Sequence, residues 1–134
     1  MDMLINLDVP DLVQAEAFYC AAFGLKRGRR LGDGVLELLG GPAPIYLLQK
    51  PAGTAPIPGG IQVRSYTRHW CPVHLDMVVP DLEAAVAQVL AAGAVQERPV
   101  ETAAWGRIAG FCDPYGHGFC LIEFIGRGYD EIAA

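Results

Sequence analysis

Apolar and polar residues follow a pattern that occurs twice along the chain. Met3–Val9 and Val73–Val79 are apolar runs of strand length, and each is followed by Pro-Asp-Leu. The second run is nearly all apolar, so we expect that strand to be covered on both faces. Proline cannot donate to a β-ladder, so each strand should end there, and the following aspartate suits a helix N-cap. Apolar residues then recur at helical spacing as far as Gly24 and Gly93, which predicts a helix after each strand. The two stripes are Leu12, Ala15, Phe18, Tyr19 and Ala22, and Leu82, Ala85, Val86, Val89 and Leu90.

Three further strand-like runs follow each predicted helix, separated by turns rich in Gly, Asp and Pro. The runs are Leu25–Leu31, Val35–Leu39 and Ile45–Gln49 in the first half, and Val95–Glu101, Trp105–Phe111 and Gly118–Phe124 in the second. Each half therefore has the order strand, helix, strand, strand, strand, which indicates an α+β fold of two βαβββ modules. One helix covers only one face of such a sheet. We therefore expect the modules to pair edge to edge as a curved mixed sheet around a cleft.

The domain organisation follows from these runs. Residues 1–50 form the first predicted module and residues 72–126 the second. Residues 51–71, rich in Pro, Gly and Thr, form a linker, and residues 127–134 form a C-terminal tail. A linker of this length either covers part of the molecule or is mobile.

The composition is that of an ordinary globular protein of 134 residues, 52% of them hydrophobic and 19% charged. A net charge of −5 argues against binding to nucleic acid or an anionic membrane, because both need clustered Lys and Arg. The one basic cluster, within residues 26–30, is interpreted as a solvated strand face, with an anion site as the alternative. With no signal-peptide pattern and no long apolar span, we expect a cytoplasmic protein. The four cysteines lack CxxC spacing and are interpreted as buried thiols.

Three motifs occur in a characteristic order. They are Val-Pro-Asp-Leu in both halves, Ala17-Phe18-Tyr19 followed by Phe23-Gly24-Leu25, and Asp113-Pro114-Tyr115-Gly116 before the last strand. In these motifs the chain resembles the glyoxalase/bleomycin-resistance/dioxygenase superfamily, whose fold is called vicinal oxygen chelate, over residues 3 to about 125. The resemblance implies a glyoxalase-like domain that binds a small molecule between its modules. It also implies a homodimer.

Metalloenzymes of this superfamily place one ligand on the first strand and one on the last strand of each module, usually His and Glu. The matching positions in this chain are Leu4, Tyr46, His74 and Cys120. Of these, His74 alone keeps a residue of the family type, and the Cys120 thiol is a possible second donor. Leucine cannot bind a metal, and hard ions such as Mg²⁺ need several oxygen ligands. No cofactor is therefore expected, and a divalent metal is possible but disfavoured.

The alternation of side chains along a strand assigns the residues of the cleft. One face is apolar and should lie under the helices, whereas the other carries polar residues that need partners when buried. The predicted ligand-binding residues are Asn6, Tyr46, Leu48, His74, Asp76, Trp105, Cys120 and Ile122. His74 and Asp76 either contact a ligand or satisfy each other. Cys120 is either a nucleophile activated by His74 or an inert buried thiol.

Three functions remain open from the sequence. The first is a metal-free protein that binds a small molecule, as bleomycin-resistance members do. The second is a lyase, isomerase or dioxygenase of the superfamily that uses His74 with Cys120 or an incomplete metal site. Its candidate catalytic residues are His74, Cys120 and Asp76. The third is a non-catalytic structural or regulatory dimer. Fold alone does not choose between them.

Overall fold

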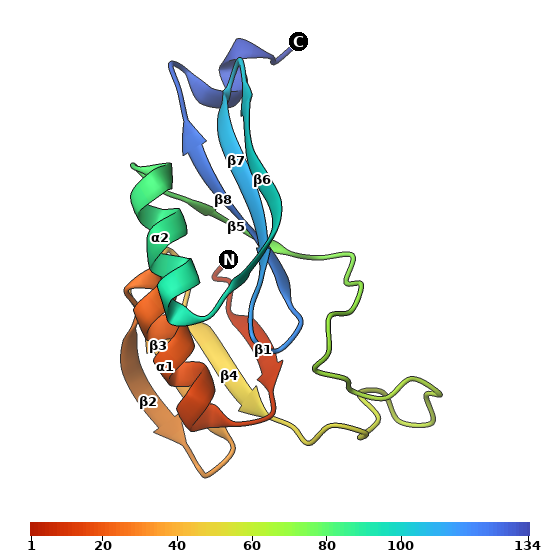
Figure 1. Cartoon of the computed structure of the whole chain (residues 1–134). Coiled ribbons are helices and arrows are strands. Elements are labelled where there is room, and N and C mark those ends of the chain that lie inside the picture. Colours follow the sequence, from red (N-terminus) through yellow and green to blue (C-terminus); the bar gives the residue numbers. More distant parts are fainter. The chain divides into compact units, whose positions relative to one another are not determined.

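The repeat predicted from the sequence is present in the computed structural model, which describes residues 1–134 (Figure 1). The chain divides into two units, Met1–Thr67 and Arg68–Ala134. Each unit contains one α-helix and one four-stranded mixed sheet in the order strand, helix, strand, strand, strand. The prediction of an α+β fold built from two βαβββ modules is confirmed.

Unit 1 is a sheet of order β1-β4-β3-β2 with one helix. Its elements are β1 (Ile5–Val9), α1 (Leu12–Phe23), β2 (Lys26–Leu31), β3 (Val35–Leu39) and β4 (Ile45–Gln49). Strands β1 and β4 are parallel, and the other neighbours are antiparallel. The five α1 residues of the predicted stripe are all buried. Gly24 ends the helix in the left-handed conformation, with φ of 67°.

Unit 2 repeats this arrangement with the sheet order β5-β8-β7-β6. Its elements are β5 (Leu75–Val78), α2 (Leu82–Ala92), β6 (Val95–Ala103), β7 (Gly106–Cys112), β8 (Gly118–Phe124) and the 3₁₀-helix η1 (Gly128–Glu131). Strand β5 is parallel to β8, and α2 packs on β7 and β8. The core of the unit includes Leu82, Val89, Ala109, Phe111 and Leu121.

The two helices are capped in the same way, and the caps show which side of each sheet a helix covers. Asp11 and Asp81 accept hydrogen bonds from backbone N–H groups three residues later. The last strand of each unit adds a second cap. Gln49 Oε1 accepts from the N–H of Leu12 at 3.3 Å, and Glu123 Oε2 accepts from that of Leu82 at 2.7 Å. Gln49 and Glu123 therefore face the helices, so the opposite face of each sheet carries the predicted site residues.

Strand β5 is less covered than the sequence predicted. An almost wholly apolar run indicated a strand buried on both faces, but Val78 is 60% exposed. The reason is that β5 lies at an edge of its sheet and pairs only with β8. In α2, likewise, Leu90 of the predicted stripe is 41% exposed, whereas Leu82 and Val89 are fully buried.

The predicted linker is divided between the two units. Residues up to Thr67 group with unit 1, and their contacts are specific. Arg64 Nε donates to Asp8 Oδ2 at 2.6 Å, and Tyr66 Oη donates to the carbonyl of Lys50 at 2.7 Å. The residues from Arg68 onward belong to unit 2. The predicted tail also packs on unit 2, because the Tyr129 ring contacts Trp105 and Phe124.

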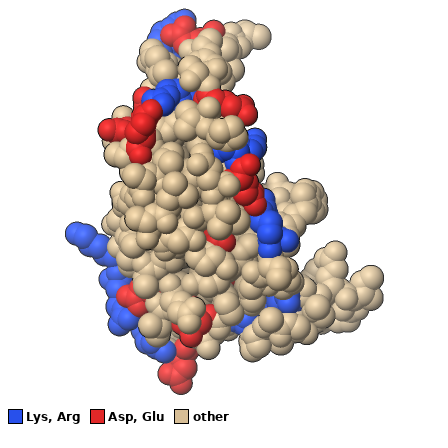
Figure 2. Space-filling view, in the orientation of Figure 1, with Lys and Arg blue, Asp and Glu red and all other residues tan.

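Basic side chains gather over β2 (Figure 2). Two of them are held in ion pairs, Arg27 with Glu16 and Arg29 with Glu37, and Arg30 donates to backbone carbonyls of the following turn. Two of the four charges of this cluster are therefore already matched within the unit. None of the helices is long and apolar enough to cross a membrane.

Candidate binding site in the second unit

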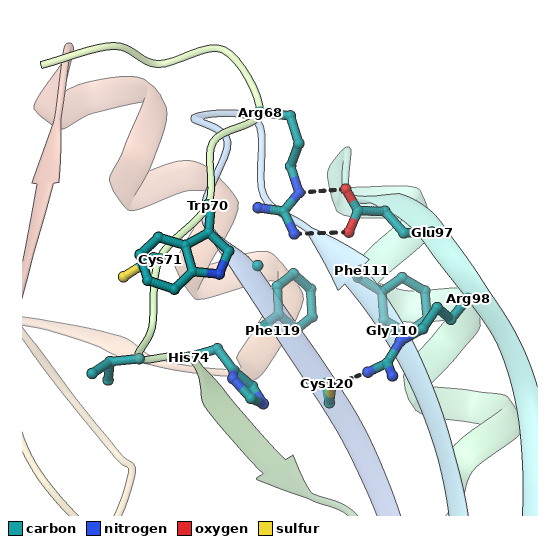
Figure 3. A pocket seen from close by; sticks show the side chains of 12 residues that line it. Arg68, Trp70, Cys71, His74, Glu97, Arg98, Gly110, Phe111, Phe119 and Cys120 are labelled. Carbon is teal, nitrogen blue, oxygen red and sulfur yellow. Dashed lines mark hydrogen bonds and ion pairs between the residues drawn. The ribbon is translucent and has the colours of Figure 1, made fainter.

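A pocket of about 300 Å³ lies in unit 2 (Figure 3). One wall comes from the segment that leads into β5, and the rest comes from β6, β7 and β8. The lining residues are Arg68, Trp70, Cys71, Val73, His74, Glu97, Arg98, Gly110, Phe111, Gly118, Phe119 and Cys120. This volume is at the lower end of the range for small-molecule sites, about 300–1,000 Å³.

One row of residues crosses the whole sheet at this pocket. Asp76 on β5 is paired with Cys120 on β8. Gly110 on β7 is paired with Cys120 on one side and with Arg98 on β6 on the other. Paired residues on neighbouring strands point to the same face of a sheet. Three polar side chains are thus placed side by side on the face opposite α2.

Arg98 reaches across the sheet because Gly110 has no side chain. A Cβ on Gly110 would stand 2.7 Å from Arg98 Nε, which is closer than such contacts allow. The guanidinium therefore lies over the β7 backbone, and its Nη2 donates a hydrogen bond of 3.1 Å to Cys120 Sγ. The pairing of β6 with β7 is irregular on both sides of Arg98, and Pro99 follows it. Such bulges redirect side chains at sheet edges.

A second arginine, Arg68, is placed in the same way over another glycine. A Cβ on Gly118 would stand 2.9 Å from Arg68 Nη2. Unlike Arg98, Arg68 forms a bidentate ion pair with Glu97, with Nε–Oε1 and Nη2–Oε2 distances of 2.5 and 3.0 Å. This ion pair lowers the pKa of the Glu97 carboxyl, mainly through its hydrogen bond to Arg68. The pair also holds the segment before β5 against the sheet.

His74, Asp76 and Cys120 form a cluster at the edge of the pocket. His74 Nε2 lies 3.1 Å from Asp76 Oδ1, and one ligand atom from each of the three residues lies within 4.8 Å of the others. The sequence placed these residues on one face, and the structure brings them together. Their nitrogen, oxygen and sulfur donors suit a borderline ion such as Zn²⁺ better than Mg²⁺.

The Cys120 thiol is not activated in this setting. It is 3% exposed, and burial raises its pKa, with a further contribution from the nearby Asp76 carboxylate. The Arg98 guanidinium acts in the opposite direction but is the smaller effect. A nucleophilic cysteine needs a lowered pKa. The hypothesis of a nucleophile activated by His74 is therefore not supported by this environment.

The superfamily's metal-ligand positions in unit 1 do not fit a metal. Leu4 has no donor atom. Tyr46 is buried, and its hydroxyl donates to Glu37 Oε1 at 2.6 Å and accepts from Arg29 Nη2 at 3.0 Å. The hydrogen bond to Glu37, together with burial, raises the pKa of Tyr46, so the phenol stays protonated. The three donors around His74 are all from unit 2.

Some predicted site residues lie elsewhere. Trp105 does not line the pocket, because its ring packs on Phe124 and Tyr129. Ile122 shares the strand face of Cys120 but is buried and does not line the pocket. The remaining three, Asn6, Tyr46 and Leu48, belong to unit 1. There Asn6 is paired with Tyr46 in the register of β1 and β4.

The two arginines of the pocket, Arg68 and Arg98, are not among the ligand-binding residues predicted from the sequence. The available signal was weak: an arginine directly before Pro99 on a predicted strand, and a glycine at position 110 within the next one. Only the register of β6 with β7 shows that the two positions face each other.

Comparison with known proteins agrees with this architecture. The fold defines the class: a glyoxalase/bleomycin-resistance/dioxygenase superfamily protein of two modules. Residues 4–122 match the model of the glyoxalase-like domain family, and the chain belongs to that family. Among curated proteins, none matches the chain.

Solved structures share the fold at low sequence identity. The fosfomycin resistance protein FosX from Listeria monocytogenes is 18% identical with a TM-score of 0.71, covering 98% of this chain and 96% of its own. The hypothetical protein SA1046 from S. aureus is 22% identical with a TM-score of 0.69, covering 92% and 96%. Lactoylglutathione lyase from Agrobacterium tumefaciens is 19% identical with a TM-score of 0.63, covering 92% of each chain. At these identities the likeness concerns the fold alone.

Proposed function

We propose that this protein binds a small molecule in the pocket of unit 2 and does so without the superfamily's complete metal site. The observation that carries the proposal is the row Asp76–Cys120–Gly110–Arg98, which places polar groups beside a pocket of about 300 Å³. A concave hollow in which a few polar groups converge beside apolar and aromatic side chains is a usual form of a ligand site. In unit 1, the family ligand positions hold Leu4 and the hydrogen-bonded Tyr46.

Ligand-observed NMR against a library of small aromatic and aliphatic compounds tests the binding. Hits are mapped by amide shift changes in ¹⁵N-labelled protein. We expect changes to concentrate at the residues that line the pocket, which fall within 68–74, 97–98, 110–111 and 118–120. Hits that perturb none of these residues would exclude this pocket as the site.

Elemental analysis of untagged protein, purified without chelators, tests the metal part of the proposal. We expect far less than one equivalent of Zn, Ni, Fe, Mn or Co. A stoichiometric metal that disappears in Cys120→Ser would show that His74, Asp76 and Cys120 form a metal centre. That result would refute the metal-free function.

An enzymatic function is the second candidate, favoured by one observation. His74 lies 3.1 Å from Asp76, and a carboxylate in this position can orient an imidazole as a general base. If the protein is a lyase, isomerase or dioxygenase, His74→Ala should abolish the turnover of a substrate identified among the NMR hits. Turnover that survives both His74→Ala and Cys120→Ala would rule out this version.

Self-association remains a separate proposal. Homodimers are expected from the family resemblance, and light scattering coupled to size-exclusion chromatography measures the mass directly against 14.4 kDa for one chain. A monomer at high concentration would count against the dimer and against a purely structural function.

A further inference from the structure

Resting on the proposed function, we propose that the ligand of unit 2 carries a carboxylate, and that Arg98 is the residue that binds it. The same geometry assigns a planar apolar body to the rest of the ligand. Three features of the pocket support this: the placement of Arg98, the balance of charge and the exposed aromatic wall.

The placement of Arg98 is built into three strands. The irregular pairing of β6 directs its side chain inward, Gly110 leaves room for it on β7, and Cys120 on β8 accepts one of its N–H groups. A guanidinium has five N–H donors, and a thiol is a weak acceptor. The bond to Cys120 therefore orients the group and leaves most of its donors for a ligand. A carboxylate accepts two parallel N–H bonds from such a fork.

The balance of charge favours a monoanion. The charged groups that line the pocket are Arg68, Arg98 and Glu97. Arg68 and Glu97 neutralise each other through two hydrogen bonds, and no carboxylate lies within ion-pair distance of Arg98. Among the residues that line the pocket, one unmatched positive charge remains. The Asp76 carboxylate beside Cys120 disfavours a second negative charge on the ligand, so a carboxylate suits the site better than a dianionic phosphonate.

The opposite side of the pocket is aromatic. Trp70 lines it and is 84% exposed, so the indole face is available for stacking. Figure 3 shows Trp70 and Arg98 on opposite sides of the hollow, with Phe119 between them. A ligand with a single ring system and one carboxylate fits both groups within about 300 Å³.

Matched pairs of acid and amide test the carboxylate directly. Benzoate with benzamide, and indole-3-acetate with indole-3-acetamide, differ in charge but hardly in shape. We expect each acid to bind at least about 10-fold more tightly than its amide in NMR titrations, since hydrogen bonds to charged groups are the stronger ones. Phenylphosphonate should bind more weakly than benzoate.

Variants locate the effect. In Arg98→Gln the acids should lose about 10- to 100-fold in affinity, whereas the amides change little. Gly110→Ala should weaken the acids as well, because its methyl group would displace the guanidinium while leaving the charge count unchanged. Arg127→Gln removes a charge from the same unit but outside the pocket, and it should bind the acids like the wild type.

The outcomes separate this inference from the proposed function. Amides that bind the pocket as tightly as acids, or acids unaffected by Arg98→Gln, would overturn the carboxylate assignment and leave ligand binding intact. A loss in Arg68→Gln but not in Arg98→Gln would likewise overturn the assignment to Arg98. If none of a broad set of acids, amides and neutral compounds perturbs the pocket residues, the proposed function itself fails.

Discussion

Tyr46 Oη donates a hydrogen bond of 2.6 Å to Oε1 of Glu37 on the neighbouring strand. The family resemblance places a metalloenzyme's glutamate ligand near Tyr46, and in this chain a carboxylate lies one strand away, on β3. Glu37 is 3% exposed and also binds Arg29 through two nitrogen donors and a backbone N–H. The carboxylate is thus committed to a structural ion pair.

Glu37 should make the stability of the protein sensitive to acid. Its hydrogen bonds with Arg29 and Tyr46 lower its pKa from 4.5 to about 2. A folded-state pKa below the unfolded value stabilises the folded state above pH 4.5, and this stabilisation is lost as the pH falls from 4.5 towards 2. Urea unfolding at intervals from pH 6 to pH 2 should show the loss. In Glu37→Gln the protein should be less stable at pH 6, and the decline over this interval should be smaller.

Asp33→Asn provides the control for acid unfolding, because it removes a carboxylate from an exposed turn of the same unit. It should retain the wild-type dependence on pH. If Glu37→Gln loses stability with falling pH as the wild type does, carboxylates other than Glu37 cause the acid sensitivity.

The fold could be predicted because its signals are local and repeated. Val-Pro-Asp-Leu contains a strand end, a cap and the first apolar residue of a helix, and both caps form as expected. Glu123 on β8 faces the helix and not the side of Cys120, as the alternation of side chains along a strand requires. These features depend only on neighbours along the chain.

The site was harder to predict because it depends on register across strands. Nothing local indicates that Arg98 faces Gly110, or that Glu37 lies beside Tyr46. Trp105 was expected in the cleft because aromatic residues often line ligand sites, but its contacts with Tyr129 depend on a C-terminal turn that carried no sequence signal. Strand β5 was expected to be buried because its composition is apolar, and composition does not reveal an edge.

The four cysteines should differ in reactivity. Cys71 is exposed, whereas Cys112 and Cys120 are buried and burial raises the pKa of both thiols. At pH 7.5, mass spectrometry after brief iodoacetamide treatment should find Cys71 modified first and Cys120 among the slowest. After unfolding in urea all four should react at similar rates. Alkylation of native Cys120 as fast as Cys71 would contradict this expectation and strengthen the enzymatic hypothesis.

The helix caps should contribute equally in the two units. Asp11 and Asp81 each accept a backbone hydrogen bond of 2.8 or 2.9 Å at a helix start. Replacing an N-cap aspartate with alanine costs about 1 kcal/mol. Chemical denaturation of Asp11→Ala and Asp81→Ala should therefore show similar losses. The sites belong to different units, so the losses of the two single variants should add in the double variant to within about 0.5 kcal/mol, and a larger departure would show that the two caps are energetically coupled.

The two tryptophans of the chain, Trp70 and Trp105, should have different roles, one in ligand binding and the other in stability. Trp105 packs on Phe124 and Tyr129 at ring distances of 6.2 and 5.0 Å, so Trp105→Phe should lower stability and leave ligand binding unchanged. Trp70 is exposed at the pocket, so Trp70→Ala should leave stability nearly unchanged and weaken the binding of ligands.

The Trp105→Phe variant also has a single tryptophan. Its fluorescence should change on titration with a ligand found by NMR, whereas that of Trp70→Phe should not. Ligand affinity that falls in Trp105→Phe and survives in Trp70→Ala would place the binding site at the opposite end of the second sheet.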